Sequence, residues 1–440
     1  MLHDVDSAVP KRAFGPDRHL RVLFINDTSR NGGPGRTILY ILKYLDPARV
    51  HRTLMLPRDG IVAERIAKAG AADILFFEPG LIENPLEPLG RQMVRGDFHA
   101  ALPLKAARLA ANLFRAGAGF ARLLRRVRRE RYDAILCNGT SAGFFGGGLA
   151  VLTGVPAIWH VLYPCVPPVV RPLHRFLAAN RNVRLIVCVS QPTAPQFDHC
   201  RRKVRMIQTA LDIDEFDPGR VTPTLRRDFA IGADTVVFGS HGRILPHKGY
   251  VELIRAARIV IDRLGAEDRA RCRFIVLGDT PQDMKRDHLE ECRALVRELG
   301  LDDYMQFVGF RPDVKSAVAD FDVAVVPSVY EDPLPRAVME SMAMSKPVAA
   351  FAMGGIAEMI EDGVEGRLAC GRPPDLDGLA KACLDYFHDP ALRLHHGQAA
   401  RRRIERDFDA RKHALKLQEE LFRVVGEARA AGSACHNVAD

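Results

Sequence analysis

The sequence predicts an α/β protein with two doubly wound domains, each built on a parallel sheet. Three observations lead to this prediction: the length of the chain, an alternation of short β-branched runs with amphipathic stretches, and a polar, turn-forming segment near the middle. At 440 residues the chain is too long for one ordinary core and suits two domains of roughly 200 residues each. Its composition, 47% hydrophobic and 27% charged, is that of a globular protein.

Short runs rich in apolar and β-branched residues predict buried strands. The runs are 21–25, 134–136, 184–189, 235–239, 273–277, 322–326 and 347–350. Helical periods separate them, as where Val251, Ile254, Ala257 and Ile261 share one face. Because strands that alternate with helices form parallel sheets, we expect ligands at the carboxyl ends of the strands.

The polar segment 213–221 predicts the domain boundary, because its Asp, Pro and Gly residues favour turns. A long charged helical pattern follows the second domain, and the chain then becomes small and polar. The predicted divisions are a polar arm at 1–19, an N-terminal acceptor domain at 20–215, a C-terminal nucleotide domain at 216–405, a helix at 406–427 that crosses back to the N-terminal domain, and a flexible tail at 428–440.

Several features predict a cytoplasmic protein. The first 19 residues lack the apolar core of a signal peptide. The nine cysteines are scattered and form no C-x-x-C pair, which fits a reducing compartment and gives no zinc or redox motif. The uncharged stretch 138–159 is long enough to span a bilayer, but glycines and a proline interrupt it, so we expect a strand–helix–strand passage there.

The first motif that suggests chemistry is the segment 239–249, GSHGRILPHKG. A strand runs into a glycine turn that carries Arg243, and Lys248 stands at the start of a helix. Two cations and free amides beside a helix N-terminus are suited to hold a diphosphate. Arg243 offers a two-pronged donor and Lys248 a point charge, so their roles differ. A surface turn with two solvated cations would have the same residues.

The second motif is the segment 327–343, PSVYEDPLPRAVMESMA. Asp332 precedes a predicted helix, where a capping role is the simpler interpretation. Glu340 lies two turns inside that helix among Val, Met and Ala residues. A carboxylate in apolar surroundings needs a partner, and ribose hydroxyls would serve.

The third motif is the segment 352–358, AMGGIAE, with glycines between a strand and a helix. In their order and spacing the three motifs resemble the retaining glycosyltransferases of family four, also called glycosyl transferases group 1, of the GT-B class. That family has the motifs along a nucleotide-binding C-terminal domain. Further similar segments, at 21–35, 158–160, 187–190, 207–218 and 307–310, extend the resemblance over about residues 20–425.

The resemblance implies two Rossmann-like domains facing across a cleft, and transfer of a sugar from a nucleoside diphosphate sugar to an acceptor hydroxyl, with retention and without a metal or further cofactor. It implies catalytic roles for four residues: Asp332 and His160 at the sugar, and Arg243 and Lys248 at the diphosphate. It implies a donor site formed by Gly32, Gly33, Gly242, Arg243, Lys248, Phe310, Leu334, Arg336 and Glu340. A histidine buried in the core is the alternative for His160, which follows Trp159.

The second motif departs from the family pattern. Counting back eight positions from Glu340 gives Asp332 where the family has Glu, and Glu331 would fill that position only if the loop slipped by one residue. Pro333 and Pro335 remove two N–H donors. The phosphate contacts that remain are Arg243, Lys248 and the amides of Leu334 and Arg336.

Asp212 and Asp214 resemble the D-x-D metal motif of another transferase class. They precede the segment 215–218, which resembles the interdomain linker of the present family, so we expect no metal there.

The net charge of +9 is concentrated in the segment 91–131, which has eleven Lys or Arg residues and two acidic ones. Apolar residues at helical spacing and an arginine at every seventh position predict an amphipathic helix, which could lie on an anionic membrane on the cytoplasmic side. Gly117 and Gly119 argue against one rigid helix, because each costs up to about 1 kcal/mol relative to Ala. A solvated helix face is the alternative, and the lack of interleaved aromatics disfavours a nucleic-acid partner.

Two other functions are compatible with these residues. One is a nucleotide-sugar epimerase with the same two domains. The other is a catalytically silent relative that tethers partners at a membrane, which the departures around Asp332 would suit. For a transferase, the acceptor could be a glycan, a lipid-linked sugar or a small molecule.

Overall fold

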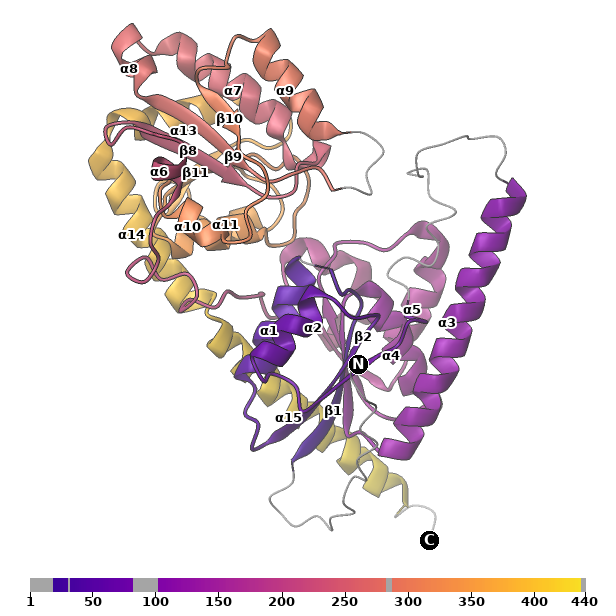
Figure 1. Cartoon of the computed structure of the whole chain (residues 1–440). Coiled ribbons are helices and arrows are strands. Elements are labelled where there is room, and N and C mark those ends of the chain that lie inside the picture. Colours follow the sequence, from indigo (N-terminus) through magenta and orange to yellow (C-terminus); the bar gives the residue numbers. More distant parts are fainter. Residues whose placement is uncertain (1–18, 31, 82–101, 282–286, 437–440) are drawn as a thin grey trace.

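The computed structural model describes residues 19–30, 32–81, 102–281 and 287–436, and shows two α/β domains stacked one above the other (Figure 1). In these residues the N-terminal sheet has seven strands, all parallel, in the order β3-β2-β1-β4-β5-β6-β7. The strands are β1 (Leu20–Asn26), β2 (Val50–Leu56), β3 (Ile74–Phe77), β4 (Ala134–Asn138), β5 (Ala157–Val161), β6 (Val183–Cys188) and β7 (Val204–Met206). The predicted fold class is confirmed.

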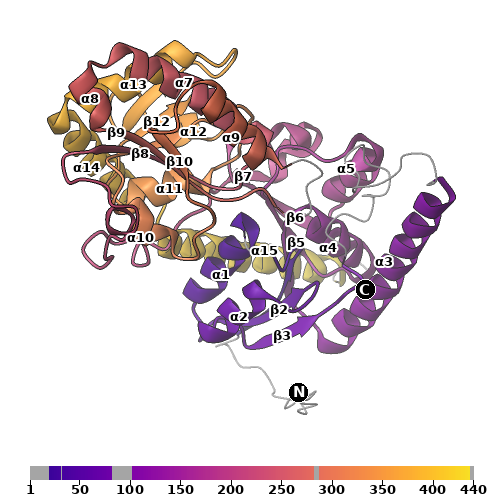
Figure 2. The same ribbon diagram turned by 45° about the horizontal axis from the view of Figure 1, so that its top comes forward.

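Helices cover both faces of the N-terminal sheet, as a doubly wound topology requires. The helices α1 (Gly33–Tyr44), α2 (Ile61–Lys68) and α15 (Ala410–His436) share one apolar core with the sheet, while α3 (Leu102–Glu130), α4 (Thr140–Thr153) and α5 (Arg171–Ala179) share the core on its other side (Figure 2).

The second described sheet has six parallel strands in the order β10-β9-β8-β11-β12-β13. The strands are β8 (Val236–His241), β9 (Cys272–Leu277), β10 (Met305–Phe307), β11 (Val323–Val326), β12 (Val348–Phe351) and β13 (Gly366–Ala369). One face packs against α7 (Tyr250–Arg263), α9 (His288–Glu298) and α13 (Leu376–His388), and the other against α10 (Val314–Val318), α11 (Arg336–Ala343), α12 (Ile356–Met359) and α14 (Pro390–Asp407). The short helices α6 (Leu225–Asp228) and α8 (Ala266–Ala270) lie in connections.

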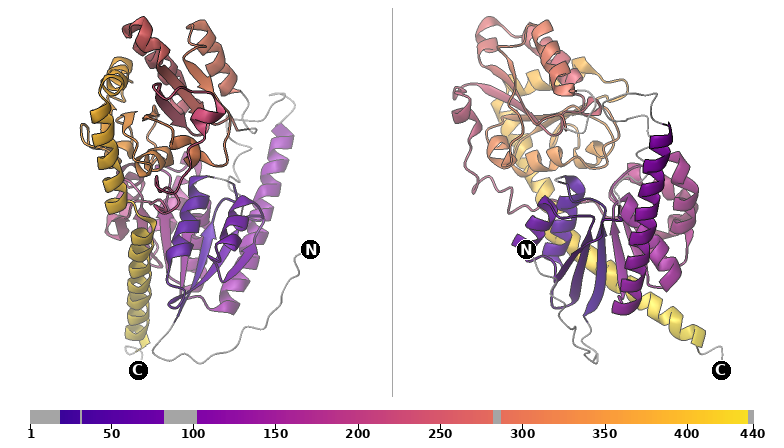
Figure 3. Two further views of the ribbon diagram at one scale, coloured as in Figure 1. Left: turned by 60° about the vertical axis from the view of Figure 1, so that its left-hand side comes forward. Right: turned by 45° about the vertical axis from the view of Figure 1, so that its right-hand side comes forward.

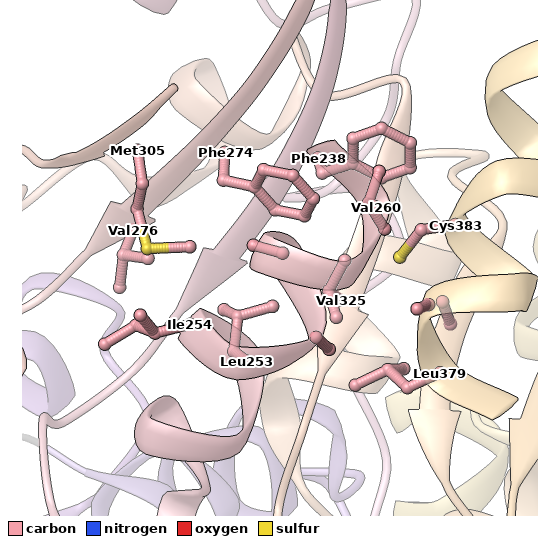
Figure 4. Packing of buried hydrophobic residues seen from close by; sticks show 14 of the residues in the cluster. Phe238, Leu253, Ile254, Val260, Phe274, Val276, Met305, Val325, Leu379 and Cys383 are labelled. Carbon is pink, nitrogen blue, oxygen red and sulfur yellow. The ribbon is translucent and has the colours of Figure 1, made fainter. Parts of the chain in front are cut away.

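Helix α7 is held to the sheet by the apolar face that its periodicity predicts. Ile254, Ala257 and Ile261 are buried, and Val251 is partly buried. Figure 4 shows Leu253 and Ile254 beneath the paired rings of Phe238 and Phe274, whose centroids are 5.0 Å apart. This packing fixes the start of α7, and therefore the turn that precedes it, against the ends of the strands.

The chain crosses back to the N-terminal domain after α14 (Figures 1 and 3). The crossing adjoins the interdomain linker, because the Leu211 amide donates to the Phe408 carbonyl at 2.9 Å and the Ala410 amide donates to the Leu211 carbonyl at 2.9 Å. Helix α15 then buries Leu417, Leu421 and Val424 against the N-terminal sheet and α1. Two chain segments therefore connect the domains side by side.

The stretch 138–159 forms the end of β4, helix α4 and most of β5, as predicted. Its glycines allow α4 to lie close to the sheet: a Cβ on Gly146 would overlap the Cys137 sulfur, and one on Gly147 would lie 2.8 Å from the Trp159 ring. Among the described residues, no helix is both long and apolar enough to cross a membrane.

Gly117 and Gly119 do not interrupt the helix of the basic segment. Helix α3 is continuous over 29 residues, from Leu102 to Glu130. Gly119 is a packing position, since a Cβ there would lie 2.7 Å from the Gly80 Cα and 2.8 Å from a Glu78 carboxylate oxygen. The close approach lets Arg122 bind Glu78 at 2.6 Å, which holds the middle of α3 to the loop after β3. The part of the segment at 91–101 lies outside the described residues.

The two glycines of α3 should respond in opposite ways to alanine. Gly117 has open space around its Cα, so Gly117→Ala is expected to raise the free energy of unfolding by about 1 kcal/mol, the helix-propensity difference. Gly119→Ala is expected to lower it by about 1–3 kcal/mol, because its methyl group would overpack against Gly80. Urea unfolding of both variants measures the difference. Equal stabilisation by both would contradict the close packing of α3.

Candidate active site

A cleft of about 330 Å³ lies between the two domains, where the carboxyl ends of strands from both sheets meet. Gly33, Pro34 and Thr37 at the start of α1 line it from the N-terminal domain, together with the segment 162–164 after β5. The C-terminal domain contributes the ends of β8 and β11 and the start of α11. The lining residues from these elements include Ser240, His241, Gly242, Arg243, Lys248, Ser328, Tyr330, Asp332, Leu334, Arg336 and Glu340.

The first motif forms a tight turn at the end of β8. A 3-10 turn at Pro246–Lys248 leads into Gly249, which has φ +77° and begins α7. A Cβ on Gly249 would overlap the Pro327 carbonyl oxygen, so only glycine lets this turn lie against the end of β11. The turn sets the position of the Lys248 side chain at the floor of the cleft.

Lys248 is paired with an acidic side chain of the second motif. Its ammonium group binds the Asp332 carboxylate, and lies 3.4 Å from the Tyr330 hydroxyl. Burial, followed by the negative charge of Asp332, raises the pKa of Tyr330, so this hydroxyl stays protonated. The three groups form a compact cluster in which a phosphate oxygen could replace the carboxylate as the partner of Lys248.

The structure distinguishes between the two acidic residues of the loop. Asp332 is buried and points into the cleft, whereas Glu331 is exposed and pairs with Arg372 at 3.3 Å on the outside of the domain. The carbonyl of Asp332 accepts a hydrogen bond of 2.8 Å from the amide of Gly355 in the third motif. A Cβ on Gly355 would overlap the Pro333 carbonyl oxygen, so the glycine allows the third motif to pack directly against the loop of the second motif.

Glu340 is buried at the bottom of the cleft and has two protein partners. His241 Nε2 lies 3.1 Å from one carboxylate oxygen, and Arg336 Nε donates to the other at 3.2 Å. Burial by itself would raise the pKa of Glu340, but the hydrogen bond from His241 and the charges of Arg336 and Arg36 outweigh it and lower the pKa to about 2. Glu340 is therefore an anion at any physiological pH.

Two further cations face the cleft beside this anion. Arg243 is exposed at the rim, and within the described residues it has no hydrogen-bond or salt-bridge partner. Arg336 begins α11 and lies over the Tyr40 ring, 5.5 Å from its centroid. The amides of Leu334 and Arg336 also donate to no described acceptor, so the start of α11 presents free N–H groups together with positive charge.

The structure does not bring His160 into the cleft. Its side chain is fully buried at the end of β5, and its ring lies 5.7 Å from that of His413 on α15. Burial, and then His413, lower the pKa of His160 well below its ordinary value. Nδ1 of His160 lies 2.8 Å from the Asn138 amide oxygen, and Asn138 donates to the Pro34 carbonyl at 3.1 Å. His160 thus reaches the glycine loop only through Asn138.

Two other predicted donor residues also lie outside the cleft lining. Phe310 is exposed in the loop after β10, where its amide donates to Asp279 at 2.9 Å. Gly32 caps α1 and is exposed, whereas Gly33 faces Arg336, whose Cδ would lie 3.8 Å from a Cβ at that glycine. Gly33 and Arg336 thus mark one place at which the two domains approach each other.

Asp212 and Asp214 form ion pairs that hold the interdomain linker to helices α1 and α15. Asp212 binds the Lys43 ammonium of α1 at 2.6 Å, and Asp214 binds the Arg411 guanidinium of α15 at 2.6 Å. Among the described residues, no three His, Cys, Asp or Glu side chains are grouped as a metal ion would need.

Sequence reasoning missed three polar groups of the site: His241, Tyr330 and Arg36. His241 and Tyr330 stand inside the first and second motifs, so their place at the ends of buried strands was a usable signal. Arg36 stands on α1, and only the facing of the two domains reveals its approach to Glu340.

Comparison with known proteins agrees with this geometry. Residues 235–389 match the family model of the glycosyl transferases group 1. The D-inositol 3-phosphate glycosyltransferase of Kribbella flavida is 34% identical over 202 residues, which are 45% of this chain and 46% of that protein. The UDP-Gal:alpha-D-GlcNAc-diphosphoundecaprenol alpha-1,3-galactosyltransferase of Escherichia coli is 22% identical over 317 residues, 68% of this chain and 77% of that protein. The chain thus spans about half the length of the first of these relatives.

The crystal structure of Anabaena Alr3699/HepE in complex with UDP superposes with a TM-score of 0.72 and 21% identity, covering 92% of this chain and 100% of that one. Two facing parallel-sheet domains with a cleft between their strand ends are thus the GT-B fold. Within that fold, the match to the glycosyl transferases group 1 family lies in the C-terminal domain, at residues 235–389.

Proposed function

We propose that this protein transfers a glycosyl group from a nucleoside diphosphate sugar to an acceptor hydroxyl in the interdomain cleft, with retention of configuration and without a metal. One observation carries the proposal: Lys248, Arg243 and Arg336 converge on one cleft whose floor holds the buried anion Glu340. Cations suit the diphosphate, and a fixed carboxylate suits ribose hydroxyls.

The mechanism needs charge stabilisation on the departing diphosphate. Lys248 and Arg243 supply it from the turn after β8, where a metal would otherwise be required. Donor binding would draw Lys248 from Asp332 to the phosphate and free that carboxylate to accept a hydrogen bond from the sugar. Closure of the two domains at Gly33 and Arg336 would exclude water and limit hydrolysis of the donor.

The names of the relatives support the reaction class and leave the acceptor open. One relative is named for an inositol phosphate acceptor and another for a lipid diphosphate acceptor, and the HepE structure contains UDP. The described cysteines are free thiols, as in proteins of a reducing compartment, which supports a cytoplasmic location.

A thermal-shift screen against UDP, GDP, ADP and their common sugars tests the proposal. We expect one base to raise the melting temperature selectively, since a ligand at a hundred times its Kd stabilises the folded state by about 2.7 kcal/mol. The selected donor is then incubated with acceptors, and Asp332→Asn is expected to lose transfer while Glu331→Gln, altered on the outside of the same loop, retains it.

Three results would contradict the proposal. An epimerised nucleotide sugar formed without acceptor would indicate the epimerase. No stabilisation by any nucleotide would favour the catalytically silent relative. Equal loss of activity in the Asp332→Asn and Glu331→Gln variants would contradict the orientation of the loop.

A further inference from the structure

Helix α5 exposes a stripe of large apolar side chains directly beside the cleft. Val169 is 69% exposed and Phe176 is 62% exposed, with Leu173 between them more than half exposed. Their spacing of four and three residues places them on one face of the 3-10 turn Pro168–Val170 and the helix that continues it. Leu177 and Ala178 are buried on the face of α5 that packs against the domain, so the exposed stripe is not part of the core.

Helix α3 adds a second apolar surface on the same side of the sheet. Phe114 is 77% exposed and Leu113 is more than half exposed. Helices α3 and α5 lie on one face of the sheet with α4 between them, and each leads into a strand (Figures 2 and 3). Because strands of a parallel sheet end at the cleft, both helices begin at that end, with Val169 at the start of the stripe nearest to it and Leu113 and Phe114 in the first half of α3.

The exposed charges on the two helices themselves are of one sign. Arg108 and Arg115 are exposed on α3, and Arg171 and Arg175 are exposed on α5. The single acidic residue of the two helices, Glu130, stands at the far end of α3 and is bonded to Arg126 at 2.9 Å. Exposed apolar groups surrounded by arginines fit an anionic bilayer, where the apolar groups enter the interface and the cations bind lipid phosphates. A second copy of the chain fits poorly, since it would bring arginines against arginines.

The apolar stripe follows closely in sequence on a loop that lines the acceptor side of the cleft. Leu162, Tyr163 and Pro164 line the cleft from the N-terminal domain, and the same loop runs on to Val169. An acceptor held in the bilayer would therefore pass along one apolar loop to reach the donor site. We propose that the 169–176 stripe and the exposed half of α3 dock on an anionic membrane, and that the acceptor sugar is carried by a lipid. The acceptor part of this inference rests on the proposed function, and the docking part does not.

Vesicle co-sedimentation tests the docking. The full chain is mixed with phosphatidylcholine vesicles, or with vesicles of equal phosphatidylcholine and phosphatidylglycerol, and we expect binding only to the second kind. Leu173→Ser/Phe176→Ser is expected to weaken binding roughly tenfold or more. Arg171→Gln/Arg175→Gln is expected to weaken it roughly twenty-five-fold, from about fivefold per cation. Leu394→Ser, which removes a 64% exposed leucine on α14 of the other domain, is the matched control and should bind as the wild type.

Each result decides the question. Binding that is unchanged in both double variants, or equally lost in Leu394→Ser, overturns the docking surface. The docking surface is also overturned if the wild type is a dimer that dissociates in Leu173→Ser/Phe176→Ser while vesicle binding persists. That result would show that the stripe binds a second copy of the chain. The nucleotide-induced thermal shift is measured on every variant and shows that each one is folded. If the wild type has no such shift, the proposed function fails while the vesicle result stands separately.

Transfer to two forms of one acceptor tests the lipid carrier. The sugar is supplied on a polyprenyl diphosphate in the anionic vesicles, or as its water-soluble glycoside at equal concentration. We expect labelled sugar to be transferred to the lipid-linked acceptor at least roughly tenfold faster than to the soluble glycoside. We expect this preference to disappear in Leu173→Ser/Phe176→Ser. Equal transfer to the soluble glycoside would overturn the lipid-linked acceptor.

Discussion

Replacing Lys248 by alanine is expected to lower turnover roughly a hundredfold or more while the protein remains folded. The ammonium group is held inside the cleft by a buried carboxylate, Asp332, and it is fixed by the turn at Gly249. Loss of one preorganised charge that stabilises a developing anion costs about a hundred- to a thousandfold in rate. Turnover at saturating donor, with the melting temperature of the same sample, measures the effect.

Two variants separate catalysis from structure in this experiment. Lys381→Ala removes an exposed lysine that pairs with Asp385 on α13, and should leave turnover unchanged. Lys248→Ala/Asp332→Asn removes the charge left unpaired in the single variant, so it should recover stability without recovering turnover. Near-normal transfer by Lys248→Ala would remove the phosphate role from this residue.

Replacing Glu340 is expected to give the largest change in stability within the site. Alanine there leaves the guanidinium of Arg336 and the imidazole of His241 without their buried partner, which costs about 3–5 kcal/mol in comparable pairs. Donor binding should be lost as well, because the ribose partner is removed. Urea unfolding at neutral pH and the nucleotide-induced thermal shift measure the two effects.

The pH dependence of stability gives a second measure of the same carboxylate. The pKa of Glu340 falls from an ordinary 4.5 to about 2 on folding, so the unfolded chain binds the proton more tightly. The resulting stabilisation, about 3 kcal/mol, is complete above the unfolded pKa and is lost as pH falls from about 5 toward 2. Glu340→Gln should flatten the curve in that window, whereas Glu298→Gln, on the exposed surface of α9, should not. An unchanged slope in Glu340→Gln would contradict the network.

Local pattern was enough to predict the fold class and the three motifs. A strand, a glycine turn and a helix are neighbours in the chain, so their periodicity and turn residues identify them, as at β8 and α7. Weaker strands were missed. Strand β2 contains the charged Arg52, which can be buried only because Asp73 of another segment binds it at 2.9 Å. Strand β10 has only three residues. Such strands exist because the sheet supplies their hydrogen bonds.

What the sequence by itself determined is therefore the α/β architecture and the cations and acids of the C-terminal motifs, since these depend on residues close in the chain. Only the tertiary structure decided that Asp332 faces the cleft and Glu331 does not, that α3 continues through Gly119, and that His160 lies against α15. Each of those outcomes depends on contacts between segments far apart in sequence, and burial and close packing have no local signature.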